Sequence, residues 1–171
     1  MIRSVCPTCN SPTLHAFGSP QSQLLIVGDA PDKASLSEGR LFASNSNFMT
    51  AGKVLRQETA RVGLDIYQFR VTSLWTHAPN KSGECFKVGY ENVLDEAKGK
   101  SAILLVGSEV VETFTPFKVS DVTGLQVDSP LLSCPIIYAM VNPSIVFAKS
   151  YGEVRFAIEQ FNKRLKEEGL I

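Results

Sequence analysis

The chain has no net charge and no long apolar run, and both absences narrow its function. Its 171 residues include 17 lysines and arginines and 17 aspartates and glutamates, so the formal net charge is zero. A net charge of zero argues against a protein that binds nucleic acid through an overall excess of positive charge. It still allows a local basic groove. No apolar run approaches the ~20 residues that a membrane-spanning helix needs. We therefore expect no membrane partner.

Two signals of other protein classes are also missing. The first residues, MIRSVCPTCN, lack the apolar core of a secretory signal peptide. No GxxxxGK[ST] loop is present, which argues against hydrolysis of nucleoside triphosphates. We expect a cytoplasmic location. In that compartment, the 4 cysteines are more often thiols or metal ligands than disulfides.

The composition is that of a globular protein, with 44% hydrophobic and 20% charged residues. The length suits one domain, which we take as residues 1–171, with residues 1–20 as an N-terminal segment that can form a metal knuckle. In four short runs, the residues directed to both faces of a strand are apolar, which predicts strands buried on both sides. The runs are Leu24–Val27, Phe69–Leu74, Ala102–Val106 and Ile136–Val141. Helical patterns cover Ala51–Val62, Phe86–Lys98, Ser108–Phe114 and Tyr151–Glu168.

Strands that alternate with helices predict an α/β fold. We expect a three-layer α/β/α sandwich with a central four-stranded, mainly parallel sheet. The stretch Pro116–Pro130 has little periodicity and is expected to be a loop with short extended pieces. No linker divides the chain.

Four polar segments follow the expected strands, at the edge where open parallel sheets bind ligands. They are GDAPD, TSLWTHAPN, GSEVV and VNPSIV. In the first, Gly28 permits a turn, Asp29 brings a carboxylate and Pro31 stiffens the loop. Asp29 and Asp32 can serve a catalytic or binding site, or they can simply hydrogen-bond the turn backbone.

Two further residues of these loops allow two interpretations each. Phe42 lies in a polar stretch, where its ring can stack on a flat ligand such as a base or pack in the ordinary way. Asn142 has a donor and an acceptor that suit recognition of a carbonyl or a water, or it can cap the next helix. Pro143 fits the first turn of that helix.

The pair CPTC, Cys6–Cys9, is half of a metal site. By itself it is compatible with a zinc knuckle, a redox pair or no special role. His15 is another possible ligand if the N-terminal segment folds as its own knuckle. Cys134 is expected to be a small buried residue, with a role as a ligand as the alternative.

Taken in order, these stretches resemble the uracil-DNA glycosylase superfamily, most closely the bacterial and archaeal family 4 enzymes that carry an iron–sulfur cluster. LLIVGDAPD resembles the family's GEAPG motif, EGRLF its EGRPF, and TAGKVL the start of its next helix. VTSLWTHAPN, AILLVGSEVV and NPS occupy the places of three later motifs, the last of which is usually HPS. The resemblance spans the chain from Cys6 to the last helix.

The resemblance implies a protein that hydrolyses the N-glycosidic bond of a flipped uracil or related base in single- or double-stranded DNA. It also implies a role for each matching position. The implied catalytic residues are Asp29 and Asn142, and the implied base-binding residues are Gly28, Ala30, Phe42 and Ser73. The implied DNA-binding residues are Ser108, Ser144 and Lys149, with Ile145 or Val146 as a wedge into the duplex.

His77 occupies the place of the family's third cysteine, and Cys85 is close enough to be the fourth ligand. The implied metal ligands are therefore Cys6, Cys9, His77 and Cys85. Such a set of three cysteines and one histidine suits Zn2+ chemically, whereas the family implies a [4Fe–4S] cluster, in which one histidine ligand is tolerated. Both cofactors remain open at this point.

Several positions depart from the family pattern. Asp29 stands where family 4 usually has glutamate, Ser73 where an asparagine often reads the uracil edge, and Asn142 where histidine is usual. The residues SNSNFM form an apparent insertion before TAGK. These departures support an alternative: a catalytically inactive, glycosylase-fold subunit that binds DNA or replication proteins such as a polymerase, as in some viruses. A flavodoxin-like nucleotide-binding module is a third possibility, disfavoured by the missing phosphate loop.

Overall fold

The computed structural model describes residues 4–43 and 49–171. Its centre is a four-stranded sheet in the order β2-β1-β3-β4, and all three strand pairs are parallel. This confirms the predicted α/β class. The expected insertion lies largely outside the described residues, because residues 44–48 are not among them. The strands are β1 (Leu24–Gly28), β2 (Arg70–Ser73), β3 (Ala102–Val106) and β4 (Ile136–Met140).

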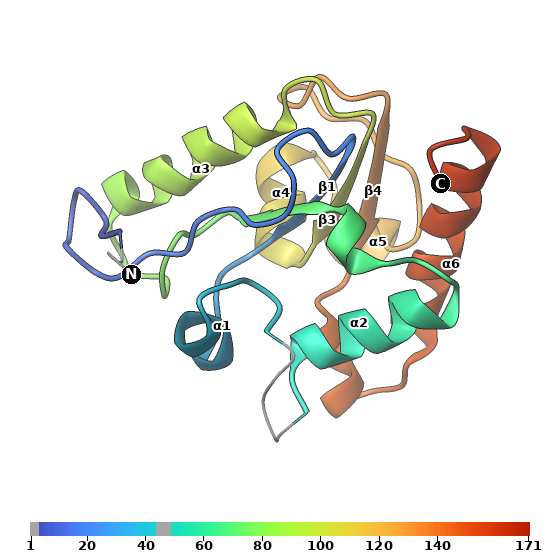
Figure 1. Ribbon diagram of the computed structural model, residues 1–171, viewed down its shortest axis with the longest axis horizontal. Coiled ribbons are helices and arrows are strands. Elements are labelled where there is room, and N and C mark those ends of the chain that lie inside the picture. Colours follow the sequence, from blue (N-terminus) through green and yellow to red (C-terminus); the bar gives the residue numbers. More distant parts are fainter. Residues whose placement is uncertain (1–3, 44–48) are drawn as a thin grey trace.

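Helices cover both faces of the sheet, as Figure 1 shows for α3 and α6 on opposite sides. Alternate strand residues point to opposite faces, so Ile26 and Leu104 pack with α2 and α6, while Leu25 and Leu105 pack with α3, α4 and α5. Burial on both faces explains why the strands are apolar at every position. The helices are α1 (Lys33–Glu38), α2 (Ala51–Arg61), α3 (Gly83–Ala97), α4 (Ser108–Phe114), α5 (Val119–Val122) and α6 (Gly152–Glu167).

Two short helices lie where loops were expected. Helix α1 interrupts the segment after β1 and is capped by Asp32, whose carboxylate accepts a hydrogen bond from the Ser35 N–H at 2.7 Å. Helix α5 interrupts the stretch from 116 to 130, which also contains extended residues that bridge β4 at Thr123 and Gln126. Both helices are too short for an apolar periodicity to reveal them.

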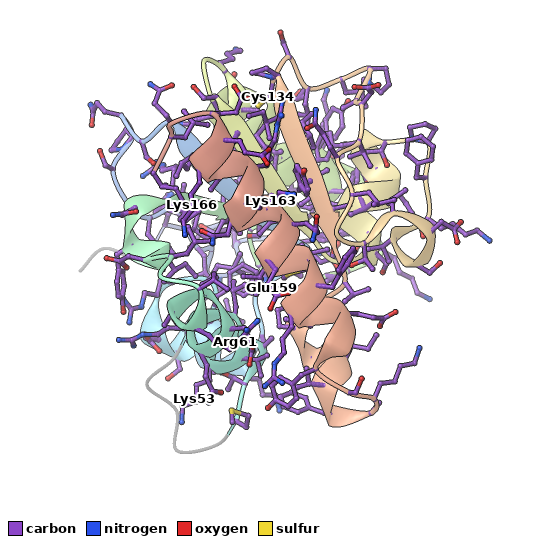
Figure 2. All side chains as sticks on the ribbon, turned by 90° about the vertical axis from the view of Figure 1, so that its right-hand side faces the viewer. Lys53, Arg61, Cys134, Glu159, Lys163 and Lys166 are labelled. Atoms are coloured by element: carbon purple, nitrogen blue, oxygen red, sulfur yellow. The ribbon has the colours of Figure 1, made fainter. Side chains whose placement is uncertain are left out.

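An ionic network joins α2 to α6. The buried carboxylate of Glu58 lies 2.9 Å from Arg61 Nε and 3.0 Å from Arg155 Nε. Arg61 also pairs with Glu159 at 2.8 Å, and Figure 2 shows these two side chains between the helices. The network fixes α2, and the start of this helix lines a cavity at the ends of the strands. Among the described residues, no helix has the length and apolarity needed to cross a membrane.

The sheet changes its winding direction between its two central strands. The chain passes from β1 to β2 on one side and later to β3 and β4 on the other, so β1 and β3 flank the switch point. Crevices at such points, beyond the carboxyl ends of the strands, are where open α/β sheets bind ligands. The segments after β1 and β3 therefore lie where a ligand site is expected.

Candidate functional site

A cavity of about 270 Å³ opens beyond the carboxyl ends of the strands. It is formed by the segment after β1, the start of α2 and the segment after β4. Four of the predicted site residues line it or its rim, namely Ala30, Phe42, Asn142 and Ser144. The other lining residues are Asp32, Ser35, Leu41, Met49, Thr50, Ala51 and Phe147.

Phe42 is held in a strained backbone conformation at one wall of this cavity. Its φ is +55°, in the left-handed region that non-glycine residues rarely adopt. Its ring lies over Gly28, where an added β-carbon would be 2.9 Å from Phe42 Cζ. Gly52 of α2 approaches from the other side, and a β-carbon there would lie 2.3 Å from the Phe42 carbonyl carbon. Strain that is held in place by surrounding packing is common at ligand sites.

Asp29 does not line the cavity; its carboxylate turns toward the switch point. Its Oδ1 accepts a hydrogen bond from the backbone N–H of Val110 at 2.8 Å, in the first turn of α4. Gly107, with φ +121°, makes room for it, because a β-carbon there would lie 2.1 Å from Asp29 Oδ2. The Asp29 carboxylate thus ties the end of β1 to the helix that follows β3, and it occupies the Val110 amide, which is then no longer available to a DNA phosphate.

The environment of Asp29 raises the pKa of its carboxyl group from 3.8 to about 6. Burial is the main cause, and the negative charges of Glu109 and Glu112 add to it, whereas the hydrogen bond from Val110 opposes it. Glu109 is itself held by the Trp75 indole N–H at 3.0 Å. A carboxyl group with a perturbed pKa at a strand-end crevice is a candidate for acid–base or electrostatic chemistry.

Two other predicted recognition residues have oxygens engaged within the protein. Asn142 caps the 3₁₀ helix η2 (Pro143–Phe147), accepting a hydrogen bond from the Ser144 N–H at 3.0 Å, and Pro143 occupies the first turn as expected. Ser73 is buried and its hydroxyl donates to the Trp75 carbonyl at 2.6 Å, away from the cavity lining. Asn142 therefore keeps its amide N–H groups for a ligand, whereas the Ser73 hydroxyl donates internally.

The predicted DNA-binding residues are exposed at the same edge. Ser108 begins α4, and Ser144 and Lys149 lie in and after η2. The suggested wedge residues Ile145 and Val146 are half-buried and pack against the core.

The large side chains that reach outward at the cavity rim are Phe147, 55% exposed, and Met49, 50% exposed. The sequence analysis gave neither residue a role at the site. Phe147 is the last residue of η2, which begins within the NPS motif at residues 142–144. The 3₁₀ geometry of η2 directs its side chain outward.

A second cluster lies beside the first turn of α3, where the N-terminal segment passes close to it (Figure 1). The ligand atoms of Cys6, Cys9, His77 and Cys85 all lie within 4.8 Å of one another. Cys6 Sγ is 3.8 Å from Cys85 Sγ, and Cys9 Sγ is 3.5 Å from His77 Nε2. The structure thus brings together the four residues predicted as metal ligands, in a group close enough to bind a metal.

The surroundings of this cluster suit metal ligation. His77 Nδ1 donates to the Ala78 carbonyl at 2.7 Å, which leaves the Nε2 lone pair directed at the sulfurs. Burial raises the pKa of the Cys6 thiol, but hydrogen bonds from the Thr8 and Cys9 backbone, His77 and Cys85 outweigh it and lower this pKa to about 6. The Asn80 amide donates to Cys85 Sγ at 3.4 Å. His15 and Cys134 lie outside this group.

Comparison with known proteins adds one positive finding. The sequence model of the family described as "Uracil DNA glycosylase superfamily" matches residues 15–166. No curated protein matches the chain. The match covers all four strands and the segments that form the cavity, and it begins after the two N-terminal cysteines.

Proposed function

Because the chain belongs to the uracil-DNA glycosylase superfamily, we propose that it excises a flipped uracil or related base from DNA by hydrolysing its N-glycosidic bond. The observation that carries this proposal is the strand-end cavity walled by Phe42 and Asn142, with the carboxyl group of Asp29 at the adjacent switch point. Active sites on this kind of sheet lie at this edge.

The reaction requires the site to stabilise two developing charges. Positive charge develops on the deoxyribose and negative charge on the departing base, as in related glycoside cleavages. The Asp29 carboxylate would stabilise the sugar cation and orient the attacking water. The amide N–H of Asn142 would donate to a base carbonyl and stabilise the leaving anion. Asp32 is the carboxylate that lines the cavity itself, so it is a second candidate for the role of Asp29.

The remaining contacts concern access to the base. A base can be reached only after it leaves the stack. Phe42 lies over Gly28 and lines the cavity together with Ala30, and its ring would stack on the flipped base. Phe147 would enter the space left in the duplex, since apolar wedges stabilise such distortions. Ser108, Ser144 and Lys149 would contact phosphates around the opening.

The test is excision from an oligonucleotide with one uracil, single-stranded or paired, followed by alkaline scission. We expect scission by the wild-type protein and by Asp128→Asn, an exposed acidic position away from the cavity lining. We expect a loss of at least 100-fold in Asp29→Asn, in line with the removal of one electrostatic catalyst. If the wild-type protein cleaves neither substrate, the proposal is wrong. If Asp32→Asn is inactive while Asp29→Asn keeps its activity, the catalytic carboxylate is Asp32.

One observation favours a second function, that of a DNA-binding subunit without activity. Asp29, Asn142 and Ser73 each have a side-chain oxygen in a hydrogen bond with the backbone, as they would in purely structural roles. This alternative, in which the partner is DNA or a replication protein such as a polymerase, predicts DNA binding that is unchanged in Asp29→Asn and no excision by either protein. Excision that depends on Asp29 would exclude it.

A metal at Cys6, Cys9, His77 and Cys85 would have a structural part in this function. The four residues are not among those lining the cavity, so the metal would hold the loop after β2 in place without touching a base. That loop also contains Trp75, which binds Glu109 beside Asp29.

A further inference from the structure

We infer that Cys6, Cys9, His77 and Cys85 bind a single tetrahedral zinc ion, and not the [4Fe–4S] cluster of the family 4 enzymes that the motifs resemble. This inference concerns the size of the site. It does not depend on the glycosylase activity proposed above.

Two of the six separations between ligand atoms match those around one tetrahedral ion. With Zn–S bonds of about 2.3 Å, two sulfurs on one tetrahedral zinc lie about 3.8 Å apart. With a Zn–N bond of about 2.05 Å, a sulfur and an imidazole nitrogen lie about 3.6 Å apart. The corresponding separations in the structure are 3.8 Å for Cys6 Sγ to Cys85 Sγ and 3.5 Å for Cys9 Sγ to His77 Nε2.

A cubane cluster needs more room. Each of its four ligands binds a different iron at a corner of the cube, so their donor atoms are separated by roughly 6 Å. Here no two of the four donor atoms are more than 4.8 Å apart. Cys6 and Cys85 are both fully buried, one in the N-terminal segment and one in the first turn of α3. Both segments would have to move apart by more than an ångström to admit the cluster.

The chemistry of the ligands agrees with the size of the site. Three thiolates and one neutral imidazole form a closed structural zinc set with no position left for water or substrate. The Nδ1–H of His77 is held by the Ala78 carbonyl, which is the outer hydrogen bond that a zinc-bound imidazole commonly makes. The ion would join the N-terminal segment, the loop after β2 and α3.

The test is the metal content of the full chain, purified anaerobically from cells supplied with both zinc and iron. We expect about one zinc per chain, no acid-labile sulfide and no broad visible absorption of an iron–sulfur cluster. Stoichiometric iron with labile sulfide, or a chain with no metal, would overturn the inference.

Variants separate this site from a chance contaminant. Cys134→Ser alters the one cysteine outside the group, on the opposite edge of the sheet before β4 and labelled in Figure 2, and should keep the zinc. His77→Cys should also keep one zinc, held by four thiolates, whereas assembly of an iron–sulfur cluster in this variant would count against the inference.

Cys85→Ser removes one of the four donor atoms and should lose the zinc. If this variant does not fold, cobalt substitution of the wild-type chain tests the site in its place. Co2+ bound to the wild-type chain should show the intense visible bands of a tetrahedral thiolate site. Weak octahedral bands would contradict the inference.

Discussion

Asp29 is placed where its negative charge is unfavourable. Its carboxyl group is largely buried and is repelled by the negative charges of Glu109 and Glu112, and the backbone N–H groups of Val110 and Glu109 compensate in part. The charged form therefore costs more in the folded protein than in the unfolded chain, and this is why its pKa is raised. Carboxyl groups whose pKa is perturbed by burial and neighbouring charges are concentrated at functional sites.

The first prediction concerns the stability of Asp29→Asn. The folded pKa of about 6 exceeds the unfolded value of 3.8, so the folded state holds more protons between these values and wild-type stability falls as pH rises through this window. The asparagine oxygen can still accept from Val110 but carries no charge. Thermal unfolding should show Asp29→Asn to be more stable than the wild type above pH 6, with the gain vanishing below about pH 4.

Asp128→Asn, at an exposed position, serves as the control and should change stability little at either pH. If the gain of Asp29→Asn were the same at pH 4 and at pH 8, ionisation of Asp29 would not be its source.

The second prediction concerns the pH dependence of excision. If the Asp29 carboxylate acts as the ionised group, the rate should rise about tenfold per pH unit below its pKa and level off above it. That pKa is about 6, raised by burial and by Glu109 and Glu112. Single-turnover rates on uracil-containing DNA between pH 5 and 8 measure this profile. A rate that is flat across this range would show that Asp29 does not titrate in the rate-limiting step.

The third prediction concerns Phe147, the exposed ring at the cavity rim. Phe147→Ala should weaken binding to uracil-containing duplex by about tenfold, since an apolar wedge supports the opened base step. Phe117→Ala is a matched control, because Phe117 is also exposed, at 42%, but does not line the cavity. Fluorescence anisotropy with labelled duplex compares them. Equal affinities in the two variants would remove Phe147 from the interface.

Among the elements, α2 decides the shape of the cavity. Its second residue, Gly52, touches the backbone of Phe42 and Ala43, so the start of the helix supports the strained turn that carries the Phe42 ring. At its other end, the network of Glu58, Arg61 and Arg155 fastens α2 to α6. The helix is thus fixed at both ends.

The fourth prediction tests the contact of α2 with Phe42. In Gly52→Ala the new β-carbon would lie 2.3 Å from the Phe42 carbonyl carbon, which is backbone and cannot step aside. We expect a loss of about 1–3 kcal/mol in the free energy of unfolding, measured with urea. Gly152→Ala, at the start of α6, meets only Ser150 Oγ at 3.4 Å and should change stability by less than about 0.5 kcal/mol. Similar losses in both variants would mean that the contact with Phe42 is not tight.

For the whole molecule, the balance of charge limits how the protein holds DNA. With a net charge of zero, general attraction to phosphates is small, and only local contacts remain, such as the one proposed for Lys149. The fifth prediction is that affinity for undamaged duplex falls only shallowly with salt, with a log–log slope of roughly −2 to −3. Titrations from low to physiological salt measure it. A slope near −6 or steeper would require a basic surface beyond these contacts.

The large-scale features of the fold could be predicted from the sequence, but the directions of several side chains could not. Strands buried on both faces, such as Ala102–Val106, are apolar at every position, and this signal survives without any structural information. The orientation of Asp29 depends on Val110, which is 81 residues away, and no local pattern encodes such a contact.

Some residues of the two sites could likewise be predicted from the sequence, and the orientation of others could not. Cys6, Cys9, His77 and Cys85 were found through the order of the family's motifs, although half of the set lies far along the chain. The outward position of Phe147 depends on the 3₁₀ turn of η2, whose period differs from that of an α-helix.

The ligand cluster also has a consequence for the order of synthesis. All four ligands lie within the first 85 residues, and together they enclose β1, α1, α2 and β2 in one closed loop of chain. During translation, metal capture can therefore precede the emergence of β3, β4 and α6. The central strand β1 gains its second neighbour only when β3 appears. If the proposed metal binds at that stage, the nascent chain would have β2 on one side of β1, and the other side of β1 would stay unpaired until β3 is synthesised.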